Sequence, residues 1–89
     1  MDLEKVRVYD LITGNVDSYD VDPSLIRLGD LLASYLEEGF EILDSKSLLV
    51  STYRELEAYV EWMRQFSKDF KSLIAIVYMG YFNVLGIRK

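Results

Sequence analysis

Cysteine and histidine are both absent from the 89 residues of this sequence, and proline occurs once. Without cysteine the chain has no disulfide framework and no thiolate metal site. Because many small secreted domains depend on disulfides, this absence favours an intracellular, cytoplasmic protein. Without histidine the chain lacks the commonest general base and the commonest metal ligand. Any catalysis would therefore rest on carboxylates, Lys, Tyr, Ser or Thr.

Motifs typical of common enzyme classes are absent as well. The sequence has no glycine-rich phosphate loop, no nucleophile elbow and no metal-ligand spacing. Residues 1–10 mix charged residues with Val and contain no apolar segment of the kind found in signal peptides. We therefore assign no catalytic residue, no metal ligand and no cofactor, and the sequence leans away from an enzyme.

Length and composition indicate one globular domain spanning residues 1–89. A chain of this length buries about 60–65% of the surface that its unfolded form exposes, so its core is thin. Hydrophobic residues make up 51% and charged residues 28%, which is the balance of a folded domain. The net charge of −5 repels phosphate backbones at long range. This charge disfavours nucleic acid as a partner and favours a basic protein surface.

The N-terminal third predicts a hairpin. Residues 5–12 alternate apolar and polar side chains, which is the period-two pattern of a strand. Gly14-Asn15 is typical of a two-residue hairpin loop, and residues 16–21 return as a second strand. This loop predicts the cross-strand pairs Val8–Val21 and Asp10–Tyr19.

Two amphipathic helices are predicted. The first begins with Asp22 as its cap and Pro23 at its first position, and it ends at Gly39. The second runs from about Tyr53 to Phe70 and has the clearest apolar stripe in the chain. Between them, residues 40–43 and 48–51 are predicted as short strands around a polar turn at residues 44–47.

The C-terminal residues 72–87 carry no charged side chain and are rich in Val, Ile and aromatic residues. Gly80 divides them into two predicted strands, 73–79 and 81–87. Met79-Gly80 is a poor hairpin turn because Met would need a positive φ, so one long strand bulged at Gly80 is the alternative. A helix of this length would span only about 24 Å, less than the roughly 30 Å of a membrane core, and we predict no membrane contact.

These elements predict an α+β fold of order ββα(ββ)αββ, with a small mixed or antiparallel sheet and both helices packed on one face. Such a sheet leaves its other face open, and a second copy of the chain is the expected cover. We therefore predict a homodimer. The expected interface residues are Trp62, Tyr78, Tyr81, Phe82 and Val84.

Two groups of acidic residues are candidate metal sites. Asp44 and Lys46 have the acid-x-Lys spacing of metal-dependent nucleases, with Glu41 just before them and Asp10 or Asp30 as the further acid. This spacing is common by chance, so a polar turn is the preferred interpretation. The second group lacks the spacing of a calcium loop and is interpreted as a solvated strand followed by a helix cap. It comprises Asp17, Asp20 and Asp22.

Aromatic side chains on the C-terminal strands offer a nucleic-acid alternative. Tyr78, Tyr81 and Phe82 have the spacing of a base-stacking platform, although core or interface packing is the preferred interpretation. The positive charge for such a module would come from Arg7, Arg54, Arg64 and Lys68. We predict instead a small intracellular protein that binds another macromolecule without catalysis, as a homodimer. A nucleic-acid-binding module and a metal-dependent nuclease remain the alternatives.

Overall fold

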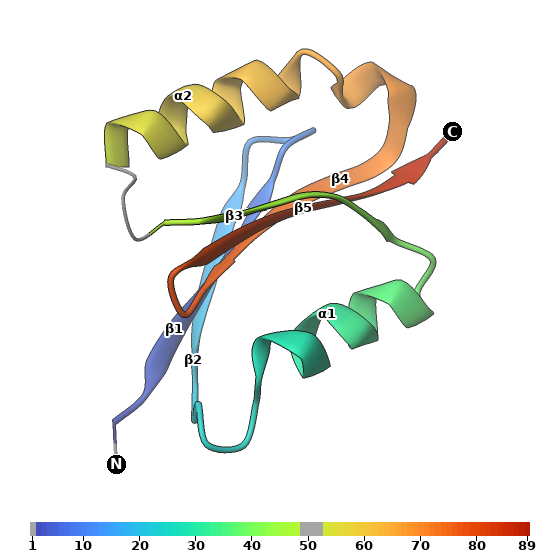
Figure 1. Ribbon diagram of the computed structural model, residues 1–89. Coiled ribbons are helices and arrows are strands. Elements are labelled where there is room, and N and C mark those ends of the chain that lie inside the picture. The colour runs from blue at the N-terminus through green and yellow to red at the C-terminus, as the bar shows by residue number, and fades with distance from the viewer. Residues whose placement is uncertain (1, 49–52) are drawn as a thin grey trace.

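A computed structural model describes residues 2–48 and 53–89 (Figure 1). In chain order its elements are β1 (Glu4–Asp10), β2 (Val16–Val21), α1 (Leu28–Glu37), β3 (Glu41–Ser47), α2 (Tyr53–Arg64), a short 3-10 helix (Ser67–Asp69), β4 (Phe70–Tyr78) and β5 (Tyr81–Arg88). The five strands form one antiparallel sheet of order β2-β1-β4-β5-β3. The predicted α+β class and the predicted order of elements are confirmed.

The two helices lie on opposite faces of the sheet, not on one face as predicted (Figure 1). Buried residues form two clusters, one under each helix. The α2 cluster includes Leu73, Phe82 and Val84, and the α1 cluster includes Ile76 and Leu85. Successive residues of β4 and β5 point to opposite faces, so a strand covered on both sides is apolar at every position. The uncharged C-terminal stretch is therefore the centre of the core.

The turn between β1 and β2 is longer than the predicted two-residue loop. The N–H of Asp10 donates to the carbonyl of Asn15 at 2.8 Å, and the Asp10 carboxylate accepts the N–H groups of Ile12 and Thr13. Because Asp10 closes a four-residue turn, the strands pair in another register than predicted. The predicted pairs Val8–Val21 and Asp10–Tyr19 do not form. The observed pairs include Val6–Tyr19, Val8–Asp17 and Tyr9–Val16.

Both helices are shorter than predicted. Asp22 does not cap α1; its carboxylate accepts the N–H and the hydroxyl of Ser24, at 2.9 and 2.6 Å. These two bonds lower the pKa of Asp22. The helix begins six residues later at Leu28, where Asp30 accepts the N–H of the cap residue Arg27 at 3.2 Å. At the other end, α2 stops at Arg64, and the chain is already strand β4 at Phe70.

The segment between the helices is one strand over the described residues. Residues 44–47, predicted as a turn, continue β3 along β5 up to the pair Ser47–Tyr81. Leu43 bulges from the ladder between Ile42 and Asp44. The second short strand predicted at residues 48–51 falls mostly outside the described residues. β3 is thus a polar strand at one edge of the sheet.

The β4–β5 hairpin confirms two strands divided at Gly80. Tyr78 and Tyr81 are paired, and the two residues between them both have positive φ, 52° at Met79 and 78° at Gly80. This is the primed turn that Met was expected to disfavour. The left-handed conformation costs a non-glycine residue about 1–2 kcal/mol, and the long ladder between β4 and β5 overrides that cost.

Replacing Met79 by Asn is expected to raise the free energy of unfolding by about 0.5–1 kcal/mol, because Asn tolerates positive φ. Met79 is half-exposed, so little packing is lost. Denaturant unfolding measures the change, and Leu25→Asn, at an exposed site outside the left-handed region, is the control. A Met79→Asn variant no more stable than this control would show that the turn is not strained.

Candidate functional site

An exposed aromatic group lies at the C-terminal end of α2. Trp62 is 52% exposed and Phe66, just beyond the helix, is 40% exposed. Their rings meet edge to face with centroids 5.1 Å apart, and the ring of Tyr59 lies 6.0 Å from that of Trp62. Aromatic side chains that stack on one another while open to solvent are the kind of group that anchors protein interfaces.

The rings of Trp62 and Phe66 border a shallow hollow of about 310 Å³ between the end of α2 and the start of β3, which we call the aromatic cleft. The Arg88 guanidinium lies 5.0 Å from the ring of Phe70, and its Nε donates to Glu41 of β3 at 2.7 Å. The cleft therefore combines apolar walls with the charged side chains of Asp69 and Arg88. It is lined by Leu43, Trp62, Met63, Phe66, Asp69, Phe70 and Arg88.

The β3 strand continues this surface as a polar edge. Tyr59 of α2 donates its hydroxyl to the Asp44 carboxylate, whose other oxygen accepts the N–H of Ser45 at 2.9 Å. The Lys46 ammonium lies 4.5 Å from the centroid of the Tyr59 ring. Burial, and then the bond to Asp44, raise the pKa of Tyr59 well above its ordinary value. Asp44 and Lys46 are both exposed, on the same side of the edge strand as α2.

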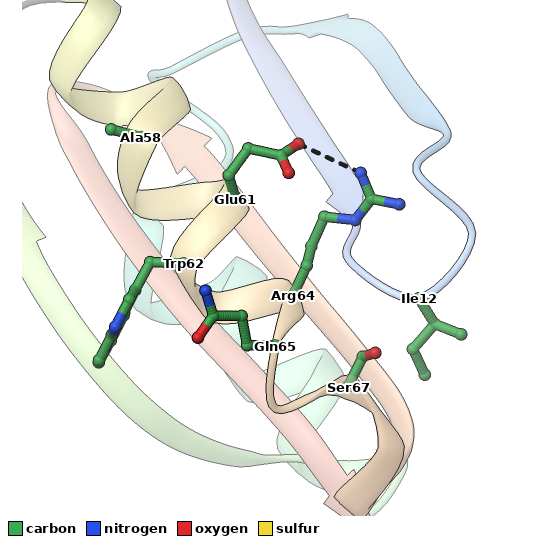
Figure 2. Close-up of a pocket in the computed structure, with 7 residues that line it drawn as sticks. All are labelled: Ile12, Ala58, Glu61, Trp62, Arg64, Gln65 and Ser67. Carbon is green, nitrogen blue, oxygen red and sulfur yellow. Dashed lines mark hydrogen bonds and ion pairs between the residues drawn. The ribbon is translucent and has the colours of Figure 1, made fainter.

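On its other flank α2 borders a polar hollow that faces the β1–β2 turn (Figure 2). Glu61 and Arg64 form an ion pair of 3.2 Å there, and Ile12 of the turn lies on the far side of Arg64. Figure 2 also shows that Trp62 leaves the helix on the side away from Ile12. Trp62 lines both this hollow and the aromatic cleft, so the two surfaces meet at its ring. The ion pair is too exposed to contribute much to stability.

One polar side chain is buried beside β3. Asn83 of β5 is almost fully buried and accepts the hydroxyl of Ser45 at 2.6 Å, while its Nδ2 has no hydrogen-bond partner. A buried amide with half of its bonding capacity unused costs stability. This pair links the edge strand to its neighbour by side chains as well as by the backbone ladder.

The five predicted interface residues do not form one surface. Phe82 and Val84 are buried under α2, and Tyr78 is buried on the α1 side, where its hydroxyl donates to the Ile26 carbonyl at 2.6 Å. Tyr81 is 47% exposed and, by its pairing with Tyr78, lies on the α1 side, opposite to Trp62. The open sheet face from which this interface was predicted is covered by α1. Association of two chains stays a prediction, and only Trp62 and Tyr81 of the five are available to it.

The base-stacking platform and the nuclease group are not assembled. Two of the three platform rings, Tyr78 and Phe82, are 1% and 0% exposed. Asp44 is engaged by Tyr59, and Glu41 is paired with Arg88. Across residues 2–48 and 53–89, no three acidic side chains come together in a way that would hold a metal ion, the aspartates of β2 included.

Sequence reasoning found Trp62 but missed the rest of this surface. Phe66 was placed in the apolar stripe of a longer helix, and the β3 edge was interpreted as a turn. The sequence does carry a signal for an edge strand, because polar and charged residues such as Asp44, Ser45 and Lys46 are typical of strands at the edge of a sheet. The contact between Asp44 and Tyr59 joins residues of different elements and has no local signature.

Comparisons with known proteins add no relative. No protein-family model, no curated protein and no solved structure matches the chain. Within the described part of the chain, neither helix has the length and apolar character needed to cross a bilayer.

Proposed function

We propose that the chain is a non-catalytic, intracellular binding protein that recognises another macromolecule through the aromatic cleft and the adjoining β3 edge. The observation that carries the proposal is the exposed stack of Trp62 and Phe66 beside the free edge of a sheet. The absence of cysteine supports the intracellular location.

An edge strand and an aromatic hollow complement each other as a binding surface. The outer side of β3 presents backbone N–H and C=O groups that an added strand can pair with. Backbone pairing of this kind supplies affinity, while neighbouring pockets select side chains of the added strand. The aromatic cleft adjoins the start of β3, where it is placed to receive one such side chain.

The charge of the chain favours a basic partner. The net charge is −5, and Glu61 lines the same hollow as Trp62. A partner carrying Lys and Arg would be attracted at long range, and its affinity would fall as salt is added. An affinity independent of salt would remove this part of the proposal.

Selection of random displayed peptides on the immobilised chain tests the proposal. We expect enriched peptides to be extended and basic, and the fluorescence of Trp62, the single tryptophan, to change when they bind. The double variant Trp62→Ala, Phe66→Ala is expected to bind fluorescently labelled copies of these peptides at least about tenfold more weakly, as is typical of central aromatic anchors.

The control is the double variant Tyr19→Ala, Leu25→Ala. It too removes two exposed large hydrophobic side chains, but both lie outside α2 and the aromatic cleft. This control should retain the wild-type affinity. The proposal is overturned if no peptide is enriched, if the Trp62 and Phe66 substitutions leave affinity unchanged, or if the control loses as much.

A further inference from the structure

We infer that the β3 edge binds the β3 strand of a second copy of this chain, antiparallel and about a two-fold axis at Ser45. This inference rests on the proposed function, because it names a partner for the same β3 edge. That partner, a second copy, is itself acidic, so local charge pairs and not the long-range attraction of a basic surface would hold it. It also replaces the interface expected at the C-terminal strands, whose central residues are buried within one chain.

Charge complementarity within β3 identifies the occupant. Asp44 and Lys46 lie on the same side of the strand, one residue before and one after Ser45. An antiparallel pair centred on Ser45 therefore sets Asp44 of each copy opposite Lys46 of the other. Two opposite-charge pairs form at once, and opposite charges facing each other across strands are favourable.

Neighbouring registers are unfavourable. A two-fold axis perpendicular to the sheet joins only residues that point to the same face, so the axis moves in steps of one residue along β3. Centring the pair on Asp44 sets two carboxylates against each other, and centring it on Lys46 sets two ammonium groups against each other. Like charges directly opposite are destabilising, so Ser45 is the favoured centre.

The side chains at this edge are placed for such a contact. The Asp44 carboxylate is held at the edge by the N–H of Ser45 and the hydroxyl of Tyr59, and Lys46 lies against the Tyr59 ring. Both charged side chains are exposed, so a second strand reaches them without unfolding anything. Pairing about this axis brings both α2 helices, with Trp62, to the same face of one continuous sheet.

The opposite edge of the sheet lacks this complementarity. β2 carries Asp17 and Asp20 and no cationic side chain, so two copies of it would bring together four negative charges. Like charges facing each other across two strands are destabilising. Of the two free edges, only β3 is complementary to itself.

Exchange of charges between two variants tests this pairing. Asp44→Lys makes the edge positive and Lys46→Glu makes it negative, so each variant alone should be monomeric. Mixed in equal amounts they should form a heterodimer, because Lys at position 44 then faces Glu at position 46. Analytical ultracentrifugation gives the masses, and circular dichroism checks the folding of each variant.

The wild-type chain is expected to be a dimer whose dissociation constant rises with salt. Lys5→Glu changes the charge by the same amount on β1, away from the β3 edge, and should leave the dimer intact. Lys46→Glu leaves Asp44 and its hydrogen bonds in place. If Asp44→Lys does not fold, the mass of Lys46→Glu alone therefore shows whether the β3 edges pair.

A wild-type monomer at every concentration overturns the self-pairing. So does a dimer that persists in Lys46→Glu. In either case the proposed function would still hold if selected peptides bind in a way that depends on Trp62 and Phe66. If the peptide selection fails as well, the proposed function and the self-pairing are both removed.

Discussion

Replacing Phe82 by Ala is expected to lower the free energy of unfolding by about 3–5 kcal/mol. Phe82 is fully buried, and its ring meets that of Tyr59 edge to face at 5.1 Å, so it joins β5 to α2. A chain of this length has a total stability of about 4–13 kcal/mol, so the loss is a large share of it. Denaturant unfolding followed by circular dichroism measures the change.

Trp62→Ala is the matched comparison, because it removes a larger aromatic ring from the surface of the same helix. Its ring is half-exposed, so we expect a loss of less than about 1 kcal/mol. Phe82→Glu places a charge in the core, so it should unfold the chain. If Phe82 lay in a dimer interface, as predicted from the sequence, the same change would instead give a folded monomer. If Phe82→Ala were tolerated as well as Trp62→Ala, the C-terminal strands would not be the core of a single chain.

Alkaline pH is expected to destabilise the fold above about pH 10. Burial, and then the bond to Asp44, raise the pKa of Tyr59 above its ordinary value of 10.0. Burial is also the main cause of the raised pKa of Tyr35 and of Tyr78. Below pH 10 these groups are protonated whether the chain is folded or not. As the pH rises beyond it, the unfolded chain releases protons that the folded chain retains, so stability falls.

The contribution of Tyr59 can be isolated with Tyr59→Phe. For one tyrosine that ionises only on unfolding, the loss is at most about 1.4 kcal/mol per pH unit. Tyr59→Phe should therefore lose stability less steeply than the wild type in urea titrations above pH 10. At neutral pH the two should differ by a constant amount, which reflects the lost bond to Asp44. Parallel losses of stability above pH 10 would show that Tyr59 is not shielded in the fold.

The C-terminal hairpin was predictable because its signal is local. β-branched and aromatic residues favour strands, and Gly80 marked the turn between them. The same stretch also indicated that both faces are covered, because strands with one solvated face alternate apolar and polar residues. The sequence prediction placed a partner chain over the second face of the sheet, whereas α1 of the same chain covers it.

The placement of the helices could not be derived from their own sequences. An apolar stripe shows that a helix packs on something, but not on which face of the sheet it packs. Asp22 and Pro23 resembled a helix start, yet Asp22 bonds Ser24 and the helix begins at Leu28. The bond from Tyr78 to the Ile26 carbonyl, which holds this segment to the sheet, joins residues far apart in the chain.

The candidate site was predictable in one residue only. Trp62 lies at the margin of an amphipathic stripe, which is a local property, and it is 52% exposed. The edge position of β3 depends on the order of all five strands. Its charged side chains can therefore be recognised as lying on a free edge only from the assembled sheet. The acid-x-Lys spacing of Asp44 and Lys46 fits a metal site as well as a charged edge strand, and spacing alone cannot distinguish the two.

The chain is expected to associate through β3 and the aromatic cleft. A map of amide chemical shifts over a dilution series of the isotope-labelled chain tests this claim most directly. We predict that the largest changes fall on Glu41–Ser47 and on the indole N–H of Trp62. Changes concentrated on β2 or α1, or spectra that do not vary with concentration, would contradict it.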